Sequence, residues 1–300
     1  MINKLYSNVK KAKKNSRGYW RYLFKLNKLI VNYFYPLSQK NNTKIGIDKS
    51  SDVIVSLTTY PARINTVWVT ISTLLNQTFK PAKVVLYLSK EQFPNGADEL
   101  PVELLKQQSR GLEIGFVDDD LKPHKKYYYA LQDYPDKMVI TADDDVFYPE
   151  NHIEKLVEAS KKYPDAVICL RSHRITTNDG EFTPYNSWKE VLTDEPDFAT
   201  IPIGCNGALY KRKFFDEELF DAEKIKEYAL FTDDLWLKIM ELKNGVKAYN
   251  CAEEPLIYFD NIFNKNTGLW HANASEDSNR NDDVWGKLIE KYTEIKELLI

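Results

Sequence analysis

The chain has 300 residues, of which 43% are hydrophobic and 28% charged, and this composition excludes a wholly disordered or fibrous protein. Its net charge of −3 conceals an asymmetry, because residues 1–47 contain eleven Lys or Arg and no acid, whereas the remaining chain contains 30 basic and 44 acidic residues. The acidic body excludes nucleic acid as the main ligand.

The basic residues 1–47 belong to a predicted helical arm, to which we assign residues 1–50. Between residues 18 and 36, cations fall on one helical face and apolar side chains near another, the latter being Trp20, Leu23, Phe24, Ile30, Val31 and Phe34. This pattern has three interpretations, of which nucleic-acid binding by the arm is the weakest. The helix can lie in the interface of an anionic membrane, or it can dock on the protein's own surface with residues 10–14 as a solvated run.

Targeting signals and cysteines bear on the compartment. No uncharged apolar run approaches the roughly 20 residues of a membrane-spanning helix, and the N-terminus lacks the features of a signal peptide. Cys169, Cys205 and Cys251 form no Cys-x-x-Cys pair, which argues against a disulfide framework or a structural zinc site. We expect a cytoplasmic protein, peripheral on the inner face of the cell membrane.

Residues 51–300 predict one α/β domain. Strands at residues 52–58, 83–88, 112–117, 137–141 and 166–170 alternate with helices near residues 65–75, 101–108, 123–131 and 151–163. This alternation is typical of a mostly parallel sheet with helices on both faces. Polar loops then surround residues 201–210, followed by a helix at 233–242, a strand at 246–251 and a last helix at 285–299.

Asp143, Asp144 and Asp145 follow the fourth predicted strand. Ligands of parallel α/β sheets bind beyond the carboxyl ends of strands, and three adjacent carboxylates there call for a compensating cation. A divalent Mn²⁺ or Mg²⁺ that holds a phosphate-bearing ligand fits this chemistry. The alternative, an exposed acidic loop that caps the next helix, is weak because that helix begins several residues later.

A second acidic triplet, residues 118–120, lies directly before the helix at Pro123, where acids favour the helix N-terminus. Lys125 and Lys126 follow at the same edge of the sheet. They are candidates for diphosphate recognition, or else part of a solvated basic turn.

Asp233 and Asp234 open a later helix behind Thr232. Their positions suit a helix N-terminus, and they also suit a carboxylate that deprotonates an acceptor hydroxyl. His271 lies in a polar, aromatic loop and is either a surface residue or a ligand.

Several motifs, taken together in this order, resemble bacterial family-2-like glycosyltransferases of the GT-A fold, in particular those of surface-polysaccharide assembly. The motifs lie at residues 53–64, 74–78, 81–86, 140–149, 204–210 and 232–236, and the resemblance covers roughly residues 52–290. Many members have an aspartate after the second strand that helps to read uracil, but residues 86–89 here contain no acid.

The resemblance implies roles for particular residues. Asp145 would contact the metal, Asp143 the metal or the ribose, and Asp234, with Asp233 beside it, would supply the base of an inverting transfer. The loop after the first strand implicates Thr58, Tyr60 and Arg63 in binding the donor nucleotide. Apart from the resemblance, we expect His271 as a further metal ligand, and Lys125, Lys126, Asp143 and Asp144 as further contacts of the nucleotide. The small-residue loop near the donor sugar and the acceptor corresponds to Cys205, Asn206 and Gly207.

We therefore expect a metal-dependent glycosyltransferase of the hexosyltransferase type, active in capsule or lipopolysaccharide biosynthesis. Its partners are a nucleotide-sugar donor, with a UDP-sugar favoured, a glycan or lipid-linked oligosaccharide acceptor, and an anionic membrane surface that meets residues 1–47. One alternative is a sugar-phosphate nucleotidyltransferase, which would want a glycine-rich phosphate loop after the first strand; residues 58–63 contain no glycine. The other is a non-catalytic, membrane-associated assembly partner.

Overall fold

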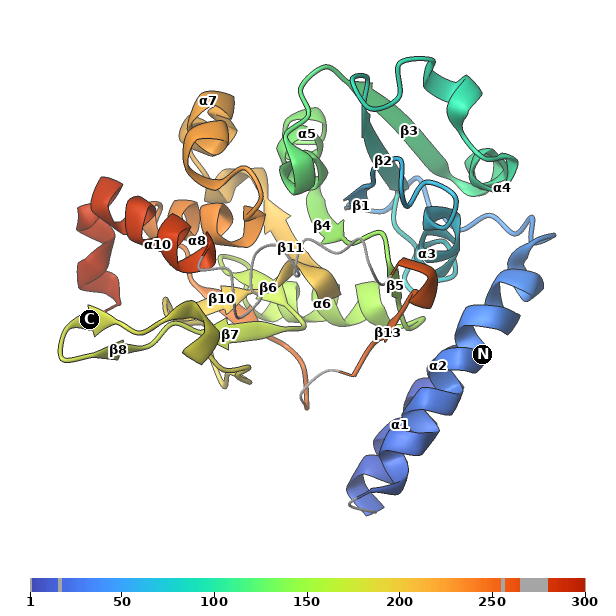
Figure 1. Cartoon of the computed structure of the whole chain (residues 1–300), viewed down its shortest axis with the longest axis horizontal. Coiled ribbons are helices and arrows are strands. Elements are labelled where there is room, and N and C mark those ends of the chain that lie inside the picture. The colour runs from blue at the N-terminus through green and yellow to red at the C-terminus, as the bar shows by residue number, and fades with distance from the viewer. Residues whose placement is uncertain (1, 16–17, 255–256, 265–279, 300) are drawn as a thin grey trace.

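The computed structural model describes residues 2–15, 18–254, 257–264 and 280–299. A sheet with helices on both of its faces forms the body, and a pair of N-terminal helices extends away from it (Figure 1). The α/β architecture expected from the alternating pattern is confirmed.

The main sheet has seven strands in the order β12-β6-β11-β4-β1-β2-β3. Neighbouring strands pair in parallel except for β11, which runs antiparallel to both β4 and β6. The strands are β1 Val53–Thr58, β2 Lys83–Ser89, β3 Leu112–Val117, β4 Met138–Ala142, β6 Val167–Cys169, β11 Ala208–Lys211 and β12 Ala248–Asn250.

Two apolar cores cover the two faces of this sheet. Successive side chains of a strand point to opposite faces, so Ile54 joins one core while Val53 and Val55 join the other. The core of Ile54 is covered by α5 Lys125–Asp133, α8 Asp233–Lys243 and α10 Arg280–Lys291. The opposite core is covered by α3 Val67–Leu74, α4 Val102–Leu105 and α6 His152–Lys162.

The central strands end together at one edge of the sheet. Leu57 of β1 lies opposite both Leu86 of β2 and Ala142 of β4. The residues that follow β1 and β4 therefore enter the same region, as the general rule for parallel α/β sheets requires.

Smaller elements lie among the loops, where three two-stranded sheets form. They pair β10 Thr200–Pro202 with β7 Ser172–Arg174, β8 Thr177–Asn178 with β9 Glu181–Phe182, and β13 Phe259–Asp260 with β5 Val146–Phe147. A short helix, α7 Ala222–Lys224, continues into a π-helical turn at Ile225–Ala229.

The structure differs from the sequence expectation at two of these places. Strand β11 was not expected, yet it lies between β4 and β6 in the middle of the sheet. The last helix was expected as one element, but α10 ends at Lys291 and a 3-10 helix, Thr293–Leu298, follows. Tyr292 leaves helical geometry between them, and its hydroxyl donates to Glu218 (2.9 Å).

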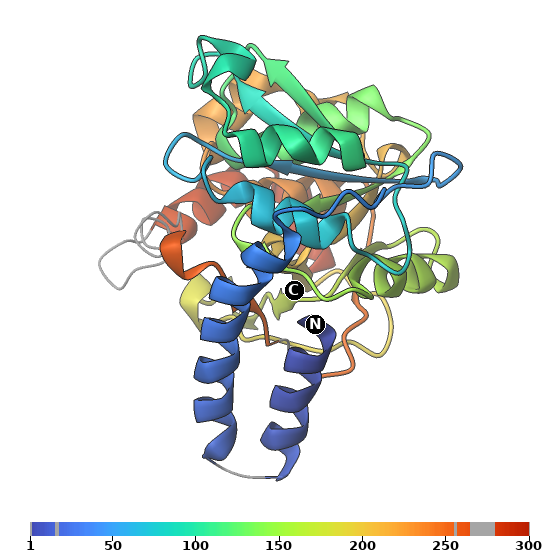
Figure 2. The same cartoon turned by 90° about the vertical axis from the view of Figure 1, so that its right-hand side faces the viewer.

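The N-terminal arm is a helical hairpin of α1 Ile2–Asn15 and α2 Tyr19–Gln39, which lie side by side (Figure 2). The expected helical arm is confirmed, but its helical pattern was recognised only within residues 18–36, so α1 itself was not expected. Its apolar residues Ile2, Tyr6 and Val9, three or four apart, are buried, while most of its lysines remain outside. The expected solvated run at residues 10–14 is therefore part of an amphipathic helix.

One face of the hairpin docks on the domain. The buried hydroxyl of Tyr6 donates to the Phe147 carbonyl (2.7 Å) and accepts from the Phe259 N–H (2.8 Å). Asn32 of α2 likewise donates to the Asp260 carbonyl (3.0 Å) and accepts from the Ile262 N–H (3.0 Å). These side chains bond backbone groups around the β5–β13 ladder, so the hairpin is joined to the domain by specific polar contacts as well as apolar ones.

We predict that Tyr6→Phe lowers the free energy of unfolding by about 1–3 kcal/mol, because it leaves buried backbone groups without their hydrogen-bond partner. The matched control is Tyr22→Phe, which removes a hydroxyl from a side chain of α2 that is 75% exposed. Urea denaturation measures both. Equal effects of the two substitutions would contradict the docking contact.

Candidate active site

Charged side chains from four segments, and the backbone of a fifth, meet at the carboxyl edge of the sheet. Asp143 follows β4, Arg63 lies in the loop after β1, Lys126 lies in α5, and Asp233 begins α8. The fifth element is the 3-10 turn Gly204–Asn206, which leads into β11. Each of these residues lies at the end of a helix or strand or in a connecting loop, and Lys126 is in the first turn of α5.

Lys126 is the central cation of the site. Its side chain is 5% exposed, and its Nζ lies 2.8 Å from Asp143 Oδ1 and 3.0 Å from Asp233 Oδ2. Burial alone would lower the pKa of this ammonium, but Asp143, Asp233 and Asp234 raise it well above its ordinary value. Lys126 therefore stays charged and joins β4 to α8.

The adjacent carboxylates Asp233 and Asp234 have opposite environments. Burial would raise the pKa of Asp233, but Lys126 and then His124 outweigh burial and lower it. Burial, and then the charge of Asp233, raise the pKa of Asp234 well above its ordinary range. Asp234 Oδ1 accepts the Gly204 N–H (3.1 Å). Because the pKa values of the two carboxylates are shifted in opposite directions, the two groups can take different roles, and Asp234 is the one that can exchange a proton.

Asp144 points inward and is 6% exposed. The Thr59 hydroxyl and Arg63 Nη1 each donate to it (2.5 Å for both), so its two oxygens are both occupied. Burial still raises the pKa of Asp144, even though Arg63 opposes that effect. Arg63 Nη1 also lies 3.0 Å from Asp145 Oδ2. Asp144 therefore fixes Arg63 and the loop after β1.

The flanking carboxylates, Asp143 and Asp145, keep more of their surface accessible, with 29% and 27% of their side chains exposed. Burial, and then the charge of Asp144, raise the pKa of Asp145 to about 7. With Asp144 and the pair on α8, five carboxylates face the two cations Arg63 and Lys126. Fully ionised, this group carries an excess of three negative charges, which a divalent cation would reduce.

The donor set fits a metal that completes its shell with a ligand. Among the described residues, no three His, Cys, Asp or Glu side chains are grouped closely enough to hold an ion alone. Mg²⁺ and Mn²⁺ are commonly held by one or two carboxylates together with substrate phosphates and water, and Asp143 and Asp145 offer two such carboxylates. His271, the third expected ligand, lies outside the described residues.

The loop at residues 204–207 packs so closely against neighbouring side chains that two of its positions require glycine. A Cβ on Gly204 would lie 2.9 Å from Asp234 Oδ1 and 3.2 Å from Lys126 Nζ. Gly207 has φ +78°, and a Cβ there would lie 2.7 Å from His152 Nε2. Side chains at these positions would push against the site itself, so the glycines let the loop pack directly on it.

Between these glycines, the sulfur of Cys205 accepts from Arg171 Nη1 (3.1 Å) and Asn206 Nδ2 (3.2 Å). Burial raises the pKa of Cys205 to about 12, although Arg171 lowers it, so the group is a thiol and a poor nucleophile. Arg171 was not expected as a site residue, although it follows β6 at the same edge of the sheet. Tyr148 was also missed, and its hydroxyl accepts the Asp143 N–H (2.9 Å).

Like the inward-pointing Asp144, two further expected nucleotide contacts face elsewhere, and another lies beside the site. The Thr58 hydroxyl donates to the Tyr87 carbonyl (2.8 Å), within the sheet. Lys125 is 2% exposed and pairs with Asp120, on the side of α5 away from Lys126. The Tyr60 ring lies 5.6 Å from the guanidinium carbon of Arg63.

Comparison with known proteins gives the following matches. The family model described as glycosyl transferase family 2 matches residues 55–220, more than half of the chain. Mannosyltransferase PcManGT from Pyrobaculum calidifontis, solved with GDP-Man and Mn²⁺, is 14% identical at a TM-score of 0.41 and covers 84% of this chain and 67% of that chain. S. aureus TarS 1-349, solved with UDP, is 16% identical at a TM-score of 0.43 and covers 81% and 72%. No curated protein matches the sequence.

We predict that Gly204→Ala lowers turnover about 100-fold, because displacement of reacting groups by about 1 Å has effects of this size. Folding should change little, since the added methyl meets the flexible ends of Asp234 and Lys126. Gly286→Ala is the control, because a Cβ there meets nothing within 4 Å. Steady-state rates and melting temperatures test the prediction. Unchanged turnover in Gly204→Ala would show that the close packing of Gly204 on Asp234 and Lys126 does not matter for catalysis.

Proposed function

The chain belongs to glycosyl transferase family 2, and we propose that it moves a sugar from a nucleotide-sugar donor to a hydroxyl of a glycan or lipid-linked acceptor. In this proposal the reaction needs Mn²⁺ or Mg²⁺ and inverts the anomeric carbon. One observation carries it: Asp143, Asp233 and Asp234 meet around the charged Lys126 at the carboxyl edge of the sheet, and Asp145 lies beside them on Arg63. Family membership favours this glycosyltransferase over the nucleotidyltransferase and the non-catalytic partner.

Asp143 and Asp145 would hold the divalent cation, which would neutralise charge on the diphosphate leaving group. Arg63 holds Asp144 and Asp145 in place, so it positions the metal-side carboxylates from the loop after β1. Tyr60, whose ring lies beside Arg63, would contact the nucleotide. PcManGT was solved with GDP-Man and TarS with UDP, and for this chain we propose a UDP-sugar.

Asp234 would act as the base. It accepts the proton of the acceptor hydroxyl while that oxygen attacks the anomeric carbon from the face opposite the diphosphate, and a single displacement of this kind inverts the carbon. Asp233 raises the proton affinity of Asp234 and stays anionic through Lys126. The proposed pathway is bacterial surface-polysaccharide assembly at the inner face of the cell membrane.

The arm supports membrane attachment through a different face from the one expected. Trp20 and Phe24 are half-buried against the domain. The outer face of α2 instead exposes an apolar stripe, whose members lie three or four residues apart: Tyr19, Tyr22, Leu26, Leu29, Tyr33 and Leu37. Arg21 and Lys25 are exposed on the same helix. No helix within the described ranges is long and apolar enough to cross a bilayer.

We predict that a UDP-sugar with Mn²⁺ raises the melting temperature of the unaltered chain, because ligand binding stabilises the native state. Asp145→Asn should abolish the Mn²⁺-dependent part of this rise. The control is Asp118→Asn, the same substitution in the other acidic triplet, where the side chain is 87% exposed. An undiminished Mn²⁺-dependent rise in Asp145→Asn would remove Asp145 from the metal site.

We predict that Asp234→Asn lowers kcat by a factor of about 10²–10⁴ while donor binding survives. Activity of the unaltered enzyme should fall as pH falls through the raised pKa of Asp234, since the base must be deprotonated. Asp233→Asn removes a negative charge that raises this pKa, so the acid limb should move to lower pH. A pH profile of kcat/KM in which Asp233→Asn leaves the limb in place would contradict the coupling.

We predict that the full chain floats with vesicles containing phosphatidylglycerol and only weakly with neutral ones. Salt should release it in part, since exposed charges are screened over about 8 Å at physiological ionic strength. Leu26→Ser/Leu37→Ser should abolish flotation, whereas Val102→Ser/Leu192→Ser, at exposed apolar positions on the domain, should not. Equal flotation of the two variants would exclude the stripe as the membrane face.

A further inference from the structure

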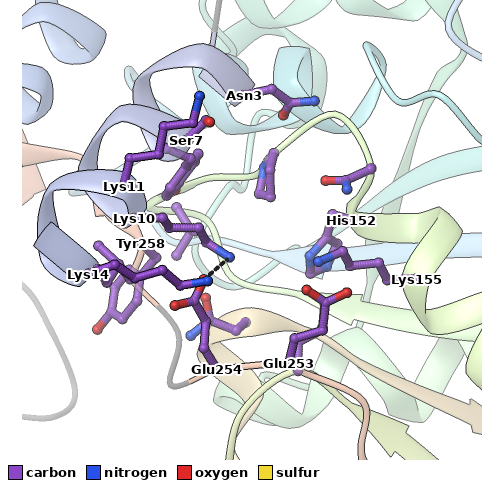
Figure 3. A pocket seen from close by; sticks show the side chains of 17 residues that line it. Asn3, Ser7, Lys10, Lys11, Lys14, His152, Lys155, Glu253, Glu254 and Tyr258 are labelled. Carbon is purple, nitrogen blue, oxygen red and sulfur yellow. Dashed lines mark ion pairs between the residues drawn. The ribbon is translucent and has the colours of Figure 1, made fainter.

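A cavity of about 320 Å³ lies between helix α1 and the domain. Helix α1 contributes Lys10, Lys11 and Lys14 to its wall, and α6 contributes His152 and Lys155 from the opposite side (Figure 3). The cavity exists only because the hairpin docks, since one wall belongs to the arm and the other to the domain.

Cations predominate in this cavity. Four lysines and two acids line it, the acids being Glu253 and Glu254. Lys10 pairs with Glu254 (3.0 Å), but Lys11, Lys14 and Lys155 form no ion pair with any residue in the described ranges. Lys14 still acts on Glu254 at longer range, but the lysines outnumber the acids by four to two, and this excess of positive charge provides a site for a multivalent anion.

His152 also lines the cavity, as a neutral side chain. It is 2% exposed, and burial lowers its pKa to about 3, so its ring is uncharged. Its Nε2 is buried against Gly207 and has no hydrogen-bond partner among the described residues, so the lysines and not this nitrogen supply the attraction for an anion.

The cavity shares a wall with the candidate active site. Val146, which lines it, directly follows Asp145, and Asn206, which also lines it, belongs to the turn whose Gly204 N–H binds Asp234. A molecule held in the cavity therefore lies beside the carboxylates of the reaction.

An apolar groove adjoins the cavity. Trp20, Phe24 and Leu29 of α2 line this groove, and Ile257 and Tyr258 line both the groove and the cavity. Lys28 crosses from α2 to pair with Asp260 at its edge. The cavity and the groove therefore share a wall. Together they connect an anion site next to the candidate active site with an apolar surface on α2.

We propose that the cavity binds the phosphate of a lipid diphosphate-linked acceptor, whose hydrocarbon chain lies in the groove along α2. This inference rests on the proposed glycosyl transfer and names the acceptor class for that same site. The donor diphosphate is a poor occupant, because its expected site is at Asp143 and Asp145. A membrane headgroup is also disfavoured, because no residue of α2 lines the cavity.

Farnesyl diphosphate is the probe, and calorimetry in metal-free buffer measures its affinity for the full chain. Lys11→Gln/Lys155→Gln should weaken binding by about tenfold or more, the effect of losing charge-assisted hydrogen bonds. Lys4→Gln/Lys161→Gln is the matched control, because both lysines are exposed on the same two helices and outside the cavity. Equal weakening in the two variants would overturn the site and indicate diffuse attraction.

Two further measurements are needed. The first distinguishes a lipid diphosphate from a membrane headgroup as the occupant of the cavity, and the second distinguishes failure of this inference from failure of the proposed function. If flotation with phosphatidylglycerol vesicles is lost only in Lys11→Gln/Lys155→Gln, the cavity binds headgroups and the acceptor assignment is overturned; equal flotation of both double variants supports it. The melting temperature of the unaltered chain with a UDP-sugar and Mn²⁺ tests donor binding alone. Failure of that test with selective farnesyl diphosphate binding intact would count against the proposed function and not against the cavity.

Discussion

The buried ammonium of Lys126 is the interaction on which the arrangement of the site depends. It lies between Asp143, at the end of β4, and Asp233, at the start of α8, and so joins two elements about 90 residues apart in the chain. Without this cation, the carboxylates would be buried together with only Arg63 to balance them. Breaking one partner of a buried ion pair leaves uncompensated charge, which is strongly destabilising.

The sheet topology brings a third segment, the turn before β11, against β4 and α8. Strand β11 enters antiparallel between β4 and β6, and the turn before it carries Gly204 against Asp234 and Lys126. The loop can approach because Gly204 has no side chain. The same turn, through Asn206, forms a wall of the cavity below α1, so one short segment is shared by the carboxylates and the arm. A change in this segment therefore affects both the carboxylate cluster and the cavity beside α1.

Much of the fold could be predicted from the sequence, because the strands and helices of residues 52–170 have local apolar periods. Strand β11 has only four residues and directly follows a Gly-Cys-Asn-Gly turn, and the lysines of α1 hide its apolar face, so neither gave a clear local signal. Lys125 and Lys126 are adjacent and equivalent in sequence, yet about 100° apart on a helix, and only tertiary packing directs one to Asp120 and the other to the site. The inward turn of Asp144 depends on Arg63 in the same way.

A double-mutant cycle between Lys126→Met and Asp233→Asn, measured as the free energy of unfolding in urea, tests this account most directly. If Lys126 holds the carboxylates of β4 and α8 together, the two substitutions should be strongly non-additive, with a coupling free energy of about 1–3 kcal/mol. The second substitution should then partly relieve the first, because it removes a buried charge that has lost its partner. Additivity within about 0.5 kcal/mol would contradict the claim that one ammonium organises the site.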